Sequence, residues 1–159
     1  MFEATISQAV VFKKVIEAIK DLITDANFDC GSGGISLQGM DAAHIALVEL
    51  QLRSTGFEPY RCDQPLALGL KLEWLSKVLK LADNKDSLTL SADDEPDTVS
   101  LRMESETKDN VKQFEVKLMD INDDRLQIPS TEYECVVKMP AGEFMKICKD
   151  LSQLGDTMV

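Results

Sequence analysis

The chain has 159 residues and a mass of 17.7 kDa. Its 44% hydrophobic and 28% charged residues are typical of a soluble globular protein, with room for one full domain or for one domain and part of another. No apolar run is long enough to span a bilayer, and the first residues lack the basic start and apolar core of a secretion signal, so we expect an intracellular protein. The four cysteines are far apart and form no Cys-x-x-Cys pair, which argues against a zinc site or a disulfide framework.

The net charge of −11 argues by itself against a polyanionic partner, but the charge is unevenly distributed. Three segments that we predict to be helices, 9–23, 73–82 and 142–154, together carry a charge of +2, so the rest of the chain carries −13. The acidic residues are therefore concentrated in the predicted strands and loops.

The first part of the chain is predicted to form a strand, a helix and then several antiparallel strands. Residues 2–7 alternate as a strand does, and Phe12, Ile16 and Ile19 recur on one face of an amphipathic helix whose opposite face carries lysines. A Gly-Ser-Gly-Gly turn and further alternation predict strands and hairpins over 27–30, 35–40, 44–53 and about 58–63.

The same order then begins twice more. Residues 65–70 are predicted as a strand, 73–82 as a helix, and strands follow at 87–92, 98–104 and 110–118. A third start has a strand at 133–139 and a helix whose apolar face comprises Phe144, Ile147, Cys148, Leu151 and Leu154. The recurrence predicts an α+β fold of repeated strand-helix-strands units, with helices on one face of antiparallel sheets. The third unit breaks off, so we expect the polypeptide to end within a domain.

The segment 118–135 between the second and third units starts acidic and then becomes apolar. Leu126, Ile128 and Pro129 stand where a solvated linker would be polar, and Pro129 favours an extended conformation at the residue before it. An extended segment with an apolar edge can dock another peptide. Alternatively, Leu126 and Ile128 hold the linker on the domain that it leaves. Both interpretations remain open at this point.

Lysines recur on the polar faces of the predicted helices. Lys77 and Lys80, like Lys146 and Lys149, are three residues apart on the face opposite the core. Such lysines could contact phosphates without reading sequence, although solvent-facing helix surfaces are commonly rich in lysine for no further reason.

Catalytic and metal-binding patterns are not found. His44 is the only histidine, and no Ser, Cys or carboxylate group converges on it by spacing. The Asp-x-Asn-x-Asp run at 120–124 lacks the glycine and the final glutamate of a calcium loop. There is no glycine-rich phosphate-binding motif. We therefore expect no enzyme, no cofactor and no metal.

Several stretches closely resemble the proliferating cell nuclear antigen family, the eukaryotic DNA sliding clamps. They are Met1-Phe-Glu-Ala, 13–23, 37–41, 60–63, 118–120, Ile128-Pro129 and 136–140. The resemblance runs in register along the whole chain but covers only somewhat over half of the family's usual length, and it ends inside the second domain.

The resemblance implies a nuclear homotrimer of two-domain subunits that closes head to tail around duplex DNA, without enzyme activity. Such a clamp is a processivity factor for DNA polymerase and a docking platform for the clamp loader and for DNA repair proteins, with no membrane association. The implied domains are 1–117, a connecting loop at 118–134, and the start of a second domain at 135–159.

The resemblance also implies three sets of site residues. The residues implied to face DNA are Lys13, Lys14, Lys20, Arg61, Lys77, Lys80, Lys146 and Lys149. Client motifs with a Gln, an aliphatic residue and two aromatics would insert at Met40, His44, Ile45, Leu126, Ile128 and Pro129. The subunit-interface edge would comprise Asn110, Lys112, Phe114 and Val116.

Three alternatives to a working ring are kept. In the family, the strand that pairs with this interface edge would lie beyond residue 159, so we expect a folded first domain that does not close the ring and binds clients weakly. The chain could then act as a client-binding adaptor or competitor off DNA. A checkpoint-type clamp subunit is a second alternative, and a hydrolase that uses the acidic turn at Asp94 and Glu95 is a distant third.

Overall fold

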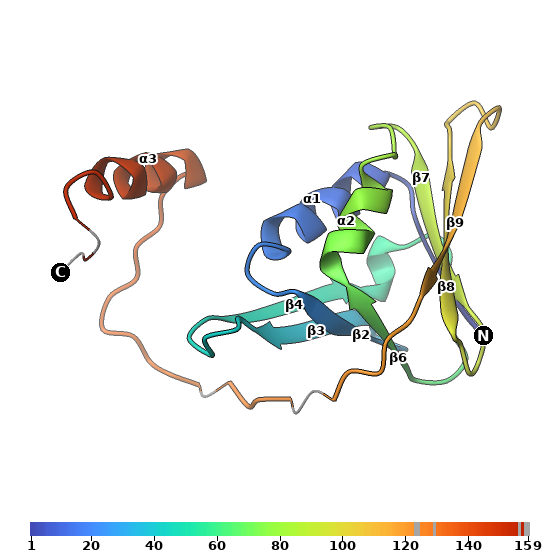
Figure 1. Cartoon of the computed structure of the whole chain (residues 1–159), viewed down its shortest axis with the longest axis horizontal. Coiled ribbons are helices and arrows are strands. Elements are labelled where there is room, and N and C mark those ends of the chain that lie inside the picture. Colours follow the sequence, from blue (N-terminus) through green and yellow to red (C-terminus); the bar gives the residue numbers. More distant parts are fainter. Residues whose placement is uncertain (123–124, 129, 156, 158–159) are drawn as a thin grey trace. The chain divides into compact units, whose positions relative to one another are not determined.

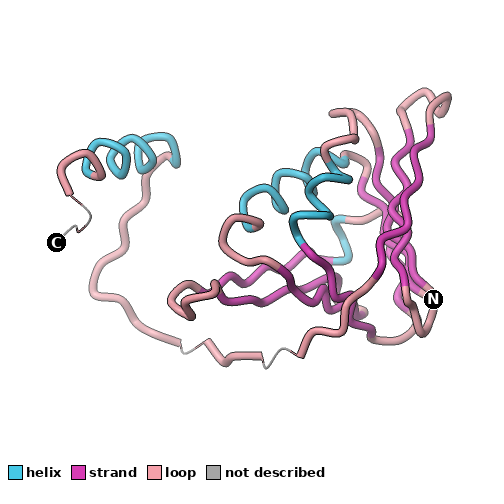
Figure 2. Tube along the Cα trace, in the orientation of Figure 1, coloured by secondary structure: helices cyan, strands magenta, loops and turns pink. Residues whose placement is uncertain are grey.

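The structure is a computed structural model that describes residues 1–122, 125–128, 130–155 and 157. The chain splits into two compact units, Met1–Arg125 and Leu126–Val159. Figure 1 labels the elements along the chain, and Figure 2 distinguishes helices from strands and loops.

The first unit contains two antiparallel sheets. The five-stranded sheet has the order β5-β1-β7-β8-β9 and the four-stranded sheet has the order β4-β3-β2-β6. The strands are β1 (Phe2–Ile6), β2 (Asp25–Gly31), β3 (Gly34–Met40), β4 (Leu47–Arg53), β5 (Tyr60–Cys62), β6 (Leu66–Lys71), β7 (Ser87–Ala92), β8 (Thr98–Glu104) and β9 (Val111–Lys117), with a short 3-10 turn at Ser54–Gly56. The predicted α+β class with antiparallel sheets is therefore confirmed.

Two helices, α1 (Ala9–Ile19) and α2 (Leu72–Leu79), contact each other, and α2 also contacts β2 and β6 (Figure 1). Their apolar faces are buried, as the predicted amphipathic pattern requires. Helix α1 ends at Ile19, earlier than the predicted 9–23. Ile23 nevertheless stays in the core with 2% of its surface exposed, and its N–H donates to the Ile19 carbonyl.

One continuous core joins the helices and both sheets. Along β7 and β8 every second side chain is buried, including Leu88, Leu90, Val99 and Leu101. Burial of each such side chain stabilises the fold by roughly 1.5–3 kcal/mol. On β2 and β3 the same alternation leaves the polar residues on the sheet face opposite this core.

The strand predicted at 44–53 begins only at Leu47. Residues 41–46 form a turn instead, in which His44 has a positive φ of 54°. The Asp41 carboxylate accepts hydrogen bonds from the N–H groups of Ile45 and Ala46, both at 2.8 Å. These side-chain contacts satisfy the backbone donors that strand pairing would otherwise use.

The second unit contains helix α3 (Ala141–Leu151), in which no residue is buried. The prediction of a strand at 133–139 is wrong, because these residues adopt no strand in the structure. Alternation favours a strand only where another strand supplies hydrogen bonds, and no described segment pairs with 133–139. In the part of the chain that the structure describes, no helix is long and apolar enough to cross a membrane.

Candidate nucleic-acid and partner interfaces

Glu73 in the first turn of α2 contacts one lysine and is influenced by the charges of two others. Lys77 donates to the Glu73 carboxylate at 2.7 Å, one helical turn away. This hydrogen bond and the Lys77 charge lower the pKa of Glu73, and the charges of Lys71 and Lys20 add to the effect. Lys20, at the end of α1, therefore lies close enough to α2 to act on its first turn.

We call Lys20, Lys71 and Lys77 the basic helix cluster. Lys71 was not predicted as a site residue, because it lies between the predicted strand at 65–70 and the predicted helix at 73–82. The structure places it directly before α2, where it is the N-terminal flanking residue. The remaining predicted lysines of this unit lie on the same two helices or at their ends: Lys14 is exposed and Lys13 half-buried on α1, and Lys80 is exposed at the end of α2.

Trp74 is a second feature of α2 that spacing alone did not single out. Its side chain is 57% exposed, and the Lys77 ammonium lies 5.2 Å from the centroid of its ring. The indole face attracts a cation at this distance. Lys77 is therefore held between a carboxylate and an aromatic ring, on a face that also presents Lys71.

Arg61 lies apart from the helix lysines. It is on β5, an edge strand of the five-stranded sheet, and forms a two-point ion pair with Asp63 at 2.8 Å. This contact lowers the pKa of Asp63. Lys146 and Lys149 are exposed on α3 in the second unit. The first unit thus brings together the helix lysines and leaves Arg61 on a sheet edge.

The residues expected to bind clients fall into two groups. Met40 ends β3, and His44 and Ile45 lie in the turn held by Asp41, with 85% of Ile45 exposed. In the second unit Leu126 and Ile128 are 46% and 52% exposed. Pro129 lies outside the described residues. Each unit therefore presents apolar side chains at positions that the sequence analysis named.

The segment that follows β9 is fixed to the outer face of the four-stranded sheet. The Met119 N–H donates to the Gly69 carbonyl on β6 at 2.9 Å, and the Asn27 amide on β2 donates to the Ile121 carbonyl at 2.8 Å. Arg125 then donates to Asp29 and to Ser36. We call the described residues 118–122 and 125 the strap. None of these contacts was predicted from the sequence.

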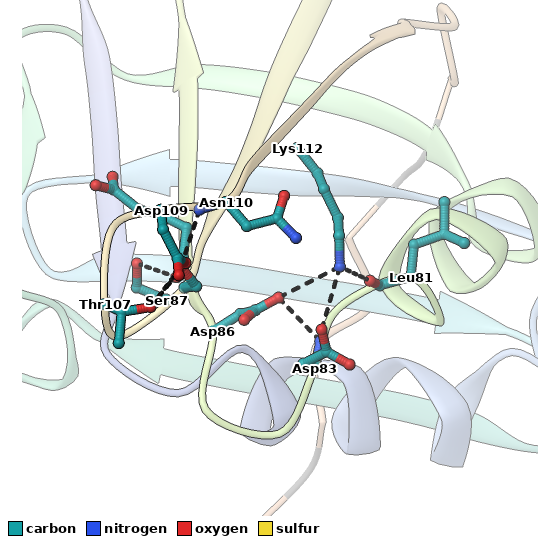
Figure 3. A network of polar contacts seen from close by, with 10 residues as sticks. Leu81, Asp83, Asp86, Ser87, Thr107, Asp109, Asn110 and Lys112 are labelled. Atoms are coloured by element: carbon teal, nitrogen blue, oxygen red, sulfur yellow. Dashed lines mark hydrogen bonds and ion pairs between the residues drawn. The ribbon is translucent and has the colours of Figure 1, made fainter.

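The side chains along the expected subunit-interface edge alternate between half-buried and exposed. Lys112, Phe114 and Val116 are half-buried, whereas the residues between them are exposed. Figure 3 shows the Lys112 ammonium reaching the Leu81 carbonyl together with Asp83 and Asp86. Asn110 closes the β8–β9 hairpin with Ser105.

An apolar groove of about 460 Å³ runs between α2 and β9. Trp74 and Val78 line it from α2, and Phe114 and Val116 line it from β9. Among the described residues, β9 pairs only with β8, so its other edge carries no strand. No group of three or more His, Cys, Asp or Glu side chains that could hold a metal ion occurs among the residues that the structure describes.

Two family models match the chain. The model of the proliferating cell nuclear antigen N-terminal domain matches residues 1–127, and the model of the C-terminal domain of the same antigen matches residues 127–159. The first match alone covers more than half of the chain and includes both sheets, both helices of the first unit and the strap. This chain therefore belongs to the proliferating cell nuclear antigen family of sliding clamps.

Proposed function

We propose that this chain is a subunit of a DNA sliding clamp that holds DNA polymerase on duplex DNA and serves as a scaffold rather than an enzyme. The basic helix cluster carries the proposal. In a chain with a net charge of −11, Lys77 on α2 pairs with Glu73, and the charges of Lys71, directly before α2, and of Lys20, directly after α1, act on the same carboxylate. A local positive surface on an acidic protein can attract phosphates while the rest of the surface repels them.

Lysines on a helix face suit sliding because they contact phosphates as mobile point charges. Such contacts carry no sequence information and are exchanged as the duplex moves. The basic helix cluster presents ammonium groups together with one exposed tryptophan, Trp74. We therefore propose weak, sequence-independent and strongly salt-dependent contacts with DNA.

The test is the fluorescence anisotropy of short labelled duplexes of two unrelated sequences, titrated with the 159-residue chain at several salt concentrations. The variant carries Lys20→Gln and Lys77→Gln. The matched control carries Lys85→Gln and Lys108→Gln, which remove the same charge from loops outside the helices. Removing one lysine that binds a phosphate should reduce the slope of log K against log salt by about 1.

We expect equal affinity for both duplexes, a slope reduced by the helix variant and a slope unchanged by the control. Binding that depends on sequence, or a helix variant that behaves like the control, would contradict the proposal. If client peptides bind but DNA does not, even at low salt, the chain would act as an adaptor off DNA.

We further propose that clients dock on Met40, His44, Ile45, Leu126 and Ile128. The exposure of Ile45 in the first unit and of Leu126 and Ile128 in the second supports this, since exposed large apolar side chains mark interaction sites where they gather into a patch. A synthetic peptide with a Gln, an aliphatic residue and two adjacent Phe residues is the probe.

The double change Leu126→Ala and Ile128→Ala should weaken binding of this peptide by about tenfold or more, because each removes buried apolar surface from the complex. The control changes Val136→Ala and Val137→Ala remove apolar groups from two more exposed side chains of the same unit, both 73% exposed. Peptide affinity that is insensitive to the first pair, or equally sensitive to both, would contradict docking at these residues.

The open edge of β9 and the groove beside it support a third proposal, that a second subunit joins the chain there. A strand edge with free N–H and C=O groups is a template for another strand. Light scattering over a range of protein concentrations measures whether the mass rises above 17.7 kDa. We expect Phe114→Glu to abolish this association and Gln113→Glu to retain it. This result would place the contact between subunits on the groove side of β9.

A further inference from the structure

The strap lies on the face of the four-stranded sheet that is turned away from the helices. It passes β6 first, where Gly69 is opposite Asn27 in the β2–β6 register. A Cβ atom on Gly69 would overlap the Met119 carbonyl oxygen. The strap can therefore lie directly against β6 only because position 69 has no side chain.

Arg125 makes the last contact of the strap, on strands further across the sheet. Its guanidinium donates to Asp29 on β2 through Nη2 at 2.6 Å and through Nε at 3.2 Å. The same Nη2 donates to the Ser36 hydroxyl on β3 at 2.6 Å. Asp29 and Ser36 are directly opposite each other in the β2–β3 register, so one side chain bridges a cross-strand pair.

This contact differs from an ordinary surface ion pair. Asp29 is 40% and Arg125 58% exposed, and a lone pair of such groups contributes little. Here, however, two strands supply acceptors to one planar guanidinium, and the Ile121 carbonyl is already held by Asn27 on β2. Arg125, Asp29 and Ser36 also line a depression of about 510 Å³ on this face.

The contact of Arg125 with Asp29 and Ser36 matters for the residues that follow it in the chain. Arg125 is the last residue of the first unit, and the next residue, Leu126, opens the second unit. Leu126 and Ile128, which we propose to bind clients, follow the strap in the chain. A fixed point directly before them restricts the conformations of this segment before a client arrives, which lowers the entropic cost of binding.

We propose that Arg125 is a positioning residue, which fixes the end of the strap to Asp29 and Ser36 and so presents the apolar residues that follow it. The proposal rests on the client-docking function proposed above. Arg125 itself touches no client. It acts through the segment that it holds.

The first test uses amide hydrogen exchange of the 159-residue chain without any client. Arg125→Gln and Asp29→Asn should each lower the protection factor of the Met119 amide, which donates to Gly69 on β6, by about twofold to tenfold, because each removes one charge of the ion pair that fixes the end of the strap. Arg125→Lys keeps the charge but not the two-point geometry, so it should retain part of the protection.

The matched control is Arg102→Gln. Arg102 is an exposed arginine on β8 that pairs with Glu104 at 3.0 Å, so the variant removes the same charge away from the strap. It should leave the protection of the Met119 amide unchanged. The reversed pair, Asp29→Arg with Arg125→Asp, should restore part of the protection that each single change removes. Protection that is unchanged in Arg125→Gln, or no restoration by the reversed pair, would overturn the anchor.

The second test titrates the same variants with the Gln-aliphatic-Phe-Phe peptide. Arg125→Gln should raise the Kd by about twofold to tenfold, and Arg102→Gln should not. A strap that loosens without any loss of peptide affinity would overturn the positioning role. If the wild-type chain binds no such peptide, the docking function itself fails, and the exchange comparison still supports or overturns the anchor by itself.

Discussion

The ammonium group of Lys112 on the edge strand β9 donates a hydrogen bond to the Leu81 carbonyl oxygen beyond the end of α2, at 2.8 Å. Asp83 and Asp86 lie 3.3 and 3.8 Å from the same nitrogen, and only 5% of Asp86 is exposed (Figure 3). Lys112 therefore joins the edge strand to the turn after α2. A lysine here also compensates the carbonyl charge at a helix C-terminus.

Lys112→Met should lower the free energy of unfolding by about 1–3 kcal/mol, because it leaves a buried carboxylate and a carbonyl without their cation. Urea unfolding followed by circular dichroism measures the change. Lys117→Met removes the same charge from an exposed position on the same strand and should stay within about 0.5 kcal/mol of the wild type. Equal effects of the two changes would show that the Lys112 contacts contribute nothing of their own.

Gly69→Ala should displace the strap from β6, because the added methyl group would meet the Met119 carbonyl and the Asn27 side chain. We expect a loss of about 1–3 kcal/mol in urea unfolding and faster exchange of the Met119 amide. The control is Gly31→Ala on β2, where a Cβ meets nothing within 4 Å. A Gly69→Ala chain as stable as this control would mean that the strap does not lie against β6.

The Asp41 carboxylate should hold the turn that presents His44 and Ile45. Hydrogen bonds from the Ala46 and Ile45 N–H groups lower the pKa of Asp41, so the folded turn favours the ionised form. The contribution of ionised Asp41 to the stability of the turn is present above the unfolded pKa, near 4. It is lost as the pH falls through the folded pKa. The protection factors of the Ile45 and Ala46 amides, which are corrected for the intrinsic exchange rate at each pH, should therefore fall on acidification. In Asp41→Asn this local pH dependence should vanish, and its persistence would assign the effect to another group.

Burial raises the pKa of the Cys30 thiol from 9.0 to about 12. Because the folded protein holds the thiol proton more tightly, stability is full below pH 9 and falls as the pH rises towards 12. Iodoacetamide at pH 8 should modify exposed Cys135 readily and Cys30 only on unfolding. The unfolding midpoint of Cys30→Val should decline less steeply above pH 9. Labelling of Cys30 at the rate of Cys135 would contradict its burial.

Much of the first unit could be predicted from the sequence, because periodicity reports burial directly. β7 and β8 have the predicted bounds, and the helices bury the predicted faces. The ends of elements were less predictable. α1 stops before Ile23, and β4 starts after His44, because local side-chain and backbone hydrogen bonds decide these ends.

The interactions that position the candidate sites could not be predicted in this way. Arg125 and Asp29 are 96 positions apart in sequence, and Lys112 and Leu81 are 31 apart, so no spacing rule connects them. The strand at 133–139 was predicted wrongly for the same reason, since a strand depends on a partner that the segment itself does not specify. The DNA-facing, client-binding and interface residues remain predictions from the family resemblance.

The most direct test of the clamp function is an NMR titration of the isotope-labelled chain with duplex DNA at low salt. A sliding clamp predicts small, gradual shift changes confined to α1, α2 and their ends, including Lys20, Lys71 and Lys77, that are the same for two unrelated duplexes and disappear as salt is raised. Changes confined to the outer face of the four-stranded sheet, or changes that differ between the duplexes, would contradict it.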